Sequence, residues 1–222
     1  MGEQRELPLF PLNTVLFPGM TLALHIFEER YKTMIGRCIE NEQPFGVVLM
    51  RAGEEVGSGD RSIYNIGTTA HITQVERLAD EQLNILSLGY QRFQIQRVHH
   101  EEPYLVGVVT DFPLMDAEHP QVRKSKDSLT PLLQRYMTIL ATIGKVEAPI
   151  TSLPDDAETL AFLAAIILRT PMADKQALLN IPDLPSLLRT ERHLLLREAQ
   201  ILKLMLDSEM RWRRDPKIFS EN

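Results

Sequence analysis

The chain has 222 residues, a formal net charge of −6 and hydrophobic residues at 44% of its positions. That length gives room for one large domain or two small ones. The acidic balance argues against a broad surface for nucleic acid or anionic membrane. The single cysteine, Cys38, excludes an internal disulfide framework and a cysteine-rich zinc site. The chain shows no signal peptide and no apolar run long enough to span a bilayer, so we expect a cytoplasmic protein.

The opening stretch, residues 8–31, favours strands yet contains Pro8, Pro11 and Pro18. Proline lacks a backbone N–H and is confined to strand ends, edges and turns. Pro18-Gly19 is typical of a turn. We therefore expect these prolines to bend the chain into a compact scaffold.

The rest of the first half predicts several strands around one helix. Between residues 28 and 43 the apolar side chains recur on one helical face, at Tyr31, Met34, Ile35, Cys38 and Ile39. Gly67 and Gly89 interrupt strand patterns and predict bulges or tight bends. Residues 79–82 suit a hairpin turn. A small, curled, mostly antiparallel barrel is predicted from strand-like segments at 44–51, 63–78, 84–98 and 104–112.

Beyond Pro113 the pattern becomes helical. Pro131 predicts a helix that begins at Thr130 or a kinked one. Asp155 to Glu158 has the spacing of a capping box before residues 159–168. A short helix is expected at 172–180, and a long one from residue 184 to 214, with leucine-rich pairs every seven residues. We predict an α+β chain with a β-rich domain at residues 1–115 and an α-helical domain at 116–222.

No group of residues predicts catalysis or a cofactor. Cys38 lies on the apolar face of its helix, where a structural thiol is expected. Adjacent strand residues point to opposite faces, so His99 and His100 do not predict a metal site. The glycine-rich residues 53–60 lack the lysine of a phosphate-binding loop, and the basic residues 211–217 suit a helix end. The sequence predicts no enzyme, no metal and no cofactor.

The opening segment resembles the start of the Lon substrate-binding domain family. The likeness rests on Leu7–Leu12, the Phe17–Gly19 turn and the segment Phe27–Tyr31. Residues 88–98 and 101–109 resemble later strands of the family, and residues 174–198 its helical part. This resemblance implies a PUA-like β pseudobarrel with one helix, followed by a C-terminal helical bundle. The chain lacks the ATPase and peptidase motifs of a Lon protease, so we expect a stand-alone substrate-binding domain.

The resemblance implies a non-catalytic module that recognises unfolded or tagged polypeptides, or a specific partner such as a protease or chaperone. We expect a binding groove formed by aromatic residues with two arginines as polar anchors: Phe17, Phe27, Arg30, Tyr31, Tyr90, Arg92, Phe93 and Tyr104. Substitution of Arg92 is expected to weaken binding without unfolding the domain. RNA binding on the PUA-like fold is the alternative, which the acidic charge opposes.

Overall fold

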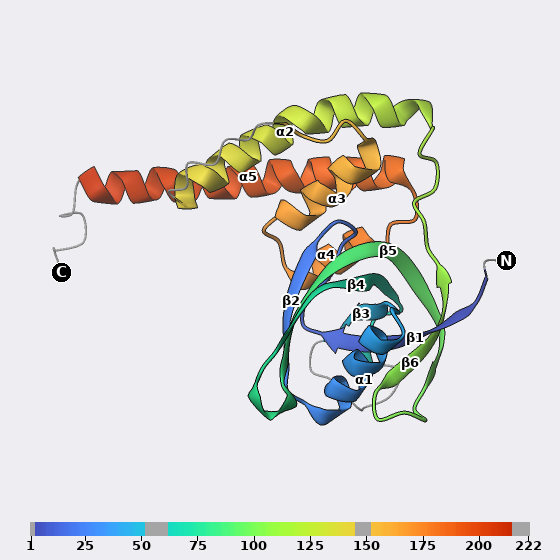
Figure 1. Cartoon of the computed structure of the whole chain (residues 1–222). Coiled ribbons are helices and arrows are strands. Elements are labelled where there is room, and N and C mark those ends of the chain that lie inside the picture. The colour runs from blue at the N-terminus through green and yellow to red at the C-terminus, as the bar shows by residue number, and fades with distance from the viewer. Residues whose placement is uncertain (1–2, 52–61, 145–151, 215–222) are drawn as a thin grey trace. The chain divides into compact units, whose positions relative to one another are not determined.

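The computed structural model describes residues 3–51, 62–144 and 152–214, with side chains described as far as residue 206 (Figure 1). The chain divides into two compact units. The strand unit comprises Met1–Met115 and Pro171–Pro182, and the helical unit comprises Asp116–Thr170 and Asp183–Asn222. One boundary between the two units lies after Met115. Residues 171–182, however, group with the strands and not with the other helices.

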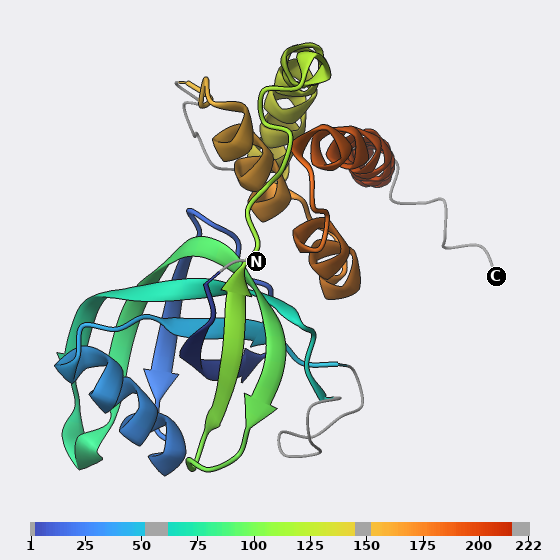
Figure 2. The same cartoon turned by 90° about the vertical axis from the view of Figure 1, so that its right-hand side faces the viewer.

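The strand unit is a sheet that closes on itself. Its strands pair in the order β2-β5-β4-β3-β1-β6, and a further pairing joins β5 to β6 (Figure 2). The ring therefore runs β5-β4-β3-β1-β6 and back to β5. Strand β2 pairs with Leu83–Leu88 of β5, on the same edge that β6 takes farther along the strand. All pairs are antiparallel except β1 with β3, as the mostly antiparallel prediction required. The strands are β1 Arg5–Leu12, β2 Thr21–Ile26, β3 Phe45–Leu49, β4 Ile66–Arg77, β5 Leu83–His99 and β6 Leu105–Asp111.

The opening prolines fit this ring because β1 changes partner along its length. Arg5–Leu9 pairs with β6, and Leu9–Leu12 pairs with β3. Each half needs only alternate N–H groups for its single neighbour, so a strand inside the sheet accommodates Pro8 and Pro11.

The predicted turn at Pro18-Gly19 is confirmed. The N–H of Met20 donates to the Phe17 carbonyl over 3.0 Å, and Gly19 has φ of 79°. These are the features of a type II turn. The turn lies against β5, where a Cβ on Gly89 would approach the Phe17 carbonyl oxygen to 2.3 Å. The β4–β5 register shifts between Thr68 and Ala70, beside Gly89 and close to Gly67, as the sequence indicated.

Helix α1, Glu29–Glu40, packs its apolar face onto the inside of the sheet. Tyr31, Met34, Ile35 and Cys38 are buried there, as predicted, in a cluster that includes residues of β1, β2, β3, β4 and β5. A second cluster, around Leu9 and Phe93, takes the alternate residues of β1 and β3 and so lies on the opposite face of these strands. Burial of this apolar area is the main stabilising contribution to the unit.

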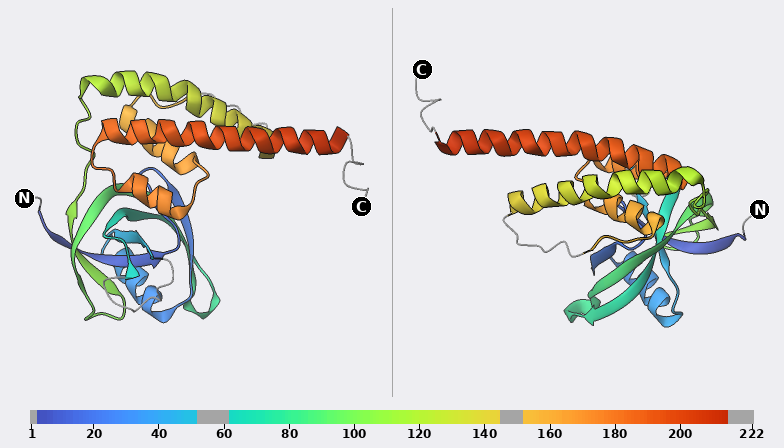
Figure 3. Two further views of the ribbon diagram at one scale, coloured as in Figure 1. Left: turned by 180° about the vertical axis from the view of Figure 1, so that it is seen from behind. Right: turned by 90° about the horizontal axis from the view of Figure 1, so that it is seen from above.

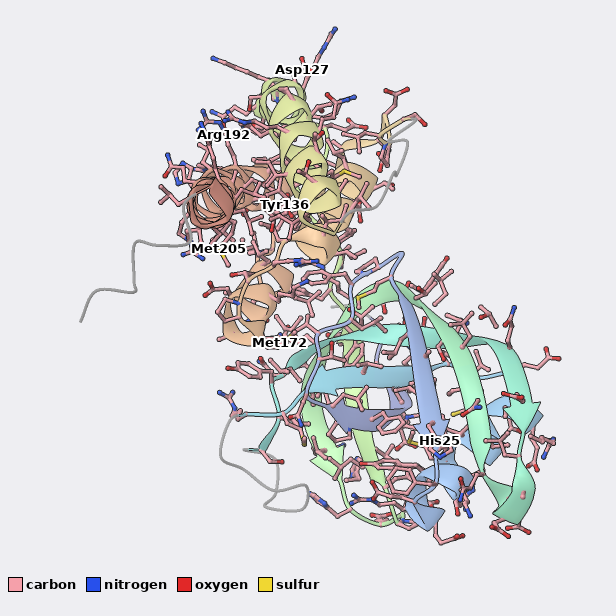
Figure 4. The ribbon with its side chains drawn as sticks, turned by 90° about the vertical axis from the view of Figure 1, so that its left-hand side faces the viewer. His25, Asp127, Tyr136, Met172, Arg192 and Met205 are labelled. Carbon is pink, nitrogen blue, oxygen red and sulfur yellow. The ribbon has the colours of Figure 1, made fainter. Side chains whose placement is uncertain are left out.

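The helical unit contains α2, Pro120–Gly144; α3, Ala157–Ile167; and α5, Leu184–Arg214 (Figure 3). Helix α2 begins at Pro120 and continues through Pro131. Of the two alternatives predicted for Pro131, the helix start at Thr130 is therefore wrong, and the proline lies inside the helix. The cap of α3 lies one residue later than expected, since the Asp156 carboxylate accepts from the N–H of Thr159 over 2.7 Å. Tyr136 is buried among these helices (Figure 4). In the described part of the chain, no helix is both long and apolar enough to cross a membrane.

Candidate functional site

Most of the residues expected to line a groove lie in the core of the strand unit. The exposed fraction of the side chain is 7% or less for each of Phe17, Tyr31, Arg92, Phe93 and Tyr104. Their burial corrects the expectation of an aromatic groove, because a buried aromatic side chain already contacts other residues of the fold and has no surface left for a ligand. Of the expected residues, Phe27 and Tyr90 have exposed side chains and Arg30 is partly exposed.

Arg92 connects the ring to helix α4, Met172–Leu179. Its Nη1 atom donates to the Leu179 carbonyl over 2.7 Å and to the Ile181 carbonyl over 2.6 Å. These carbonyls lie at the C-terminal end of α4, where unsatisfied acceptors and the helix dipole favour a cation. The guanidinium also lies 4.7 Å from the centre of the Phe112 ring. Arg92 is therefore a structural residue of the strand unit.

Gln176 and Lys175 hold the same helix from its other side. The amide of Gln176 donates to the Ile66 carbonyl over 3.0 Å. Lys175 lies 6.0 Å from the centre of the Phe17 ring, and burial lowers the pKa of its ammonium group. Helix α4 is thus attached to the ring by polar anchors as well as by apolar contacts.

Tyr31 and Tyr104 also have roles within the fold. Tyr31 stacks on Phe10 with ring centres 4.1 Å apart, and burial raises the pKa of its hydroxyl. The Tyr104 hydroxyl accepts from Arg37 over 2.9 Å, which connects β6 to the end of α1. Arg30 is partly exposed and bonds to Glu28 at 2.7 Å beside the Tyr31 ring.

Phe27 and Tyr90 mark one surface of the sheet. Their side chains are 57% and 64% exposed. Each packs against an exposed histidine: the Phe27 ring lies 5.8 Å from that of His25, and the Tyr90 ring 5.2 Å from that of His71. Figure 4 shows His25 on β2. We call this surface, on the side of β2, β5 and β4 away from α1, the outer face: it consists of His25, Phe27, His71, Leu86, Leu88 and Tyr90.

The register of the strands orders these residues along one face, with His71, Leu88 and Tyr90 toward one end and His25 and Phe27 toward the other. His71 and Thr21 both pair with Leu88, and Ala23 pairs with Leu86. Toward Phe27, the side chains of His25, Asn84 and Glu76 are joined across the three strands by hydrogen bonds of 2.9 and 2.8 Å. The outer face is therefore an ordered surface with an apolar centre and a polar border.

Sequence reasoning missed His25, His71, Leu86 and Leu88. One signal was available in β5, where Leu83 and Ile85 fill one phase of the alternation while Leu86 and Leu88 fill the other. A strand with apolar residues in both phases is either buried on two sides or has an apolar surface. In β5 the second phase is partly exposed.

The described residues give no support to nucleophilic or metal chemistry. Cys38 is buried, and burial raises the pKa of its thiol to about 11, which suppresses the reactive thiolate. No group of three His, Cys, Asp or Glu side chains in the described segments is arranged to hold a metal ion. The site is one of shape and apolar surface.

Comparison with known proteins agrees with this fold. Residues 6–197 match the family described as the ATP-dependent protease La (LON) substrate-binding domain. The chain belongs to the Lon substrate-binding domain family. Lon protease 2 of Myxococcus xanthus is 28% identical over 202 residues, which cover 89% of this chain and 24% of that protein. The chain thus spans about a quarter of the length of the Lon proteases it matches first.

Solved Lon N-terminal domains share the fold. A Lon N-terminal domain protein from Xanthomonas campestris is 26% identical, with a TM-score of 0.59 over 83% of this chain and 95% of that one. The N-terminal domain of the Mycobacterium avium complex Lon protease is 19% identical, with a TM-score of 0.60 over 86% and 98%. The likeness confirms an α+β Lon substrate-binding domain.

Proposed function

We propose that the protein is a non-catalytic module that binds unfolded polypeptides, or an exposed segment of a partner protein, on the outer face. The observation that carries this proposal is the exposure of two aromatic residues on one ordered sheet surface. Aromatic side chains gain most when an apolar partner covers them. The closed ring behind them, which we infer to be a PUA-like pseudobarrel, holds that surface rigid.

The outer face suits a neutral, apolar partner. Leu88 and Leu86 lie between the two aromatic–histidine pairs. The ionisable groups are His25 and His71 within the face and the Glu76 carboxylate at its border, where it accepts from Asn84. No lysine or arginine belongs to the outer face, so the face lacks the cations that phosphate recognition requires. No observation favours RNA as the partner. Membership in a substrate-binding family supports a polypeptide.

Fluorescence anisotropy of labelled casein, titrated with the full chain, tests the proposal. We expect saturable binding that changes little with salt, because apolar contacts are not screened. The double variant Phe27→Ser, Tyr90→Ser is expected to bind at least about tenfold more weakly. The matched control is Met115→Ser, which removes a similarly exposed apolar side chain elsewhere on the same unit.

Both variants change exposed positions, so their unfolding midpoints in urea should stay close to that of the parent chain. Equal affinity of the double variant and the control would contradict the outer face as the site. Absence of any binding by the parent chain would contradict the proposed function itself.

A further inference from the structure

One side of β4 has no strand neighbour over half of its length. In the described part of the chain, β3 pairs with β4 only at Thr68–Ala70, while β5 accompanies β4 as far as Arg77. The edge from His71 to Arg77 therefore presents backbone N–H and C=O groups without a ladder on that side. Such an edge is a template for another strand unless something covers it.

Helix α1 runs beside this edge (Figure 2). Two cavities lie between α1 and the residues of β4 and the β4–β5 turn. A cavity of about 380 Å³ lies between the end of α1, at Ile39 and Gln43, and the strand residues 71–75. A second cavity of about 520 Å³ lies between Lys32 and Gly36 of α1 and the β4–β5 turn, from Arg77 at the end of β4 to Leu83 at the start of β5. We call the two cavities together the α1–β4 groove: α1 lines one side of both, and the other side is lined by β4 in the first and by the β4–β5 turn in the second.

In the described segments, no feature of the fold requires a glycine at position 36. It lies inside α1, where glycine costs up to about 1 kcal/mol relative to alanine. Its φ is not positive, and a Cβ built on it meets no atom within 4 Å. Neither backbone conformation nor packing within the chain explains the missing side chain. Its absence leaves the wall of the groove open to a backbone that approaches from outside.

The charges along the groove favour a neutral occupant. Its wider cavity has two carboxylates, Glu29 and Glu81, and two cations, Lys32 and Arg77. Lys32 is already bonded to Glu29 and to the Asp80 carbonyl, at 2.8 and 2.9 Å. The balanced and partly satisfied charges of this cavity select no ion, and Leu78 offers apolar surface beside them. The narrower cavity adds the Glu42 carboxylate, which disfavours an anionic occupant.

We propose that the α1–β4 groove binds an extended, uncharged polypeptide segment, which adds as a strand to the free edge of β4 and passes over Gly36. This inference rests on the proposed function for the kind of partner, but it assigns a second site and a different mode of binding. Strand addition takes its affinity from main-chain hydrogen bonds and reads alternate side chains in flanking hollows. The free edge of β4 supplies the main-chain hydrogen bonds, and the two cavities supply the spaces for alternate side chains.

A bulge defines where the added strand pairs. The β4–β5 register shifts between Ile72 and Gln74, and the hydroxyl of Thr73 donates to the Leu86 carbonyl over 2.9 Å. A bulge interrupts regular pairing, so we place the added ladder on Gln74–Arg77, opposite Gly36. The groove beside His71–Thr73 then takes side chains only.

The test uses the full chain and a fluorescein-labelled Val/Thr peptide. Gly36→Leu fills the groove, and Glu40→Leu places the same side chain on α1 at a position outside the lining residues. We expect Gly36→Leu to bind the peptide at least about tenfold more weakly, and Glu40→Leu to bind as the parent does. A peptide N-methylated at two adjacent central residues should lose a similar factor, because it has lost N–H donors on both of its edges.

Hydrogen exchange of the parent chain locates the site. Amides within Gln74–Arg77 should exchange more slowly when the peptide is present. Equal binding by Gly36→Leu, equal binding of the N-methylated peptide, or no protection at Gln74–Arg77 would overturn the proposal. Binding of casein without binding of the peptide would overturn it and leave the proposed function standing. Binding of neither would contradict both.

Discussion

Tyr90 and Phe93, three positions apart on β5, show why the exposure of single side chains was hard to predict from the sequence. Strict alternation gives Leu86, Leu88, Tyr90 and Arg92 the same face. The structure exposes Tyr90 but buries both Arg92 and Phe93, because the register shifts between the partners of Gly89 and Arg92. A bulge changes the phase of every residue beyond it. Residue types therefore indicated aromatic candidates without showing which of them reach the surface.

Substitution of Arg92 tests its structural role. Arg92→Met keeps an unbranched apolar chain and leaves the carbonyls of Leu179 and Ile181 without this donor. We expect the free energy of unfolding to fall by about 2–4 kcal/mol, because buried charge-assisted hydrogen bonds are lost. Urea unfolding followed by circular dichroism measures the change. Arg30→Met, at a partly exposed surface pair, should cost less than about 1 kcal/mol.

Glu191 is a second residue whose role is visible only in the structure. It lies within α5 with its side chain fully buried, and neither carboxylate oxygen has a hydrogen-bond partner among the described residues. Burial raises the pKa of this carboxyl well above its ordinary value. The folded chain therefore keeps the proton at pH values where the unfolded chain has released it.

The buried carboxyl of Glu191 makes the free energy of unfolding depend on pH. Above the ordinary glutamate pKa near 4.3, the unfolded state binds fewer protons than the folded state, so stability falls as pH rises, by at most about 1.4 kcal/mol per pH unit. We expect Glu191→Gln to remove this slope up to the raised pKa. Urea unfolding of parent and variant at several pH values measures the difference. Parallel curves for the two proteins would show that Glu191 is ionised in the folded state.

Among the elements, local chemistry was predictable and pairing was not. The turn at Pro18-Gly19, the apolar face of α1 and the hairpin near residue 80 depend on neighbours in the sequence, and all three were expected. The parallel pairing of β1 with β3 and the ring closure by β5 and β6 depend on contacts far apart in the chain. Long-range pairing leaves no periodic signal in any one strand.

The cap of α3 carries a prediction for that helix. Asp156 accepts from the N–H and the hydroxyl of Thr159, which lowers the pKa of its carboxyl. We expect Asp156→Ala to lower the free energy of unfolding by about 1 kcal/mol at neutral pH. The stabilisation is present above the ordinary aspartate pKa and is lost as pH falls through the lowered one. Asp155→Ala, the position that the sequence pattern favoured, is the control and should change stability little.

At the scale of the whole molecule, the strand unit includes helix α4, although α4 lies far from the strands in the sequence. Its eight residues look like one more member of the helical half, since their pattern does not reveal that Lys175 and Gln176 are buried polar anchors. The sequence therefore indicated a division at residue 115 but not the return of residues 171–182 to the strands.

Two fragments test this assignment. Residues 1–115 alone leave Arg92 without the Leu179 and Ile181 carbonyls. The same residues joined to 171–182 by a Gly/Ser linker restore them. We expect the joined fragment to unfold at clearly higher urea, because a buried charge without partners is strongly destabilising. Identical midpoints would show that α4 adds nothing to the unit.

The closed ring also determines when the strand unit can fold during synthesis on the ribosome. Arg5 bonds to Asp111, a separation of 106 residues, and Arg92 bonds to Ile181, a separation of 89. The first strand made by the ribosome therefore waits for the last strand, and the finished ring waits for α4. At about 5–20 residues per second the N-terminal segment spends several seconds with its apolar side chains exposed. A protein that we propose to bind unfolded chains is thus, while it is being made, a long-lived unfolded chain itself.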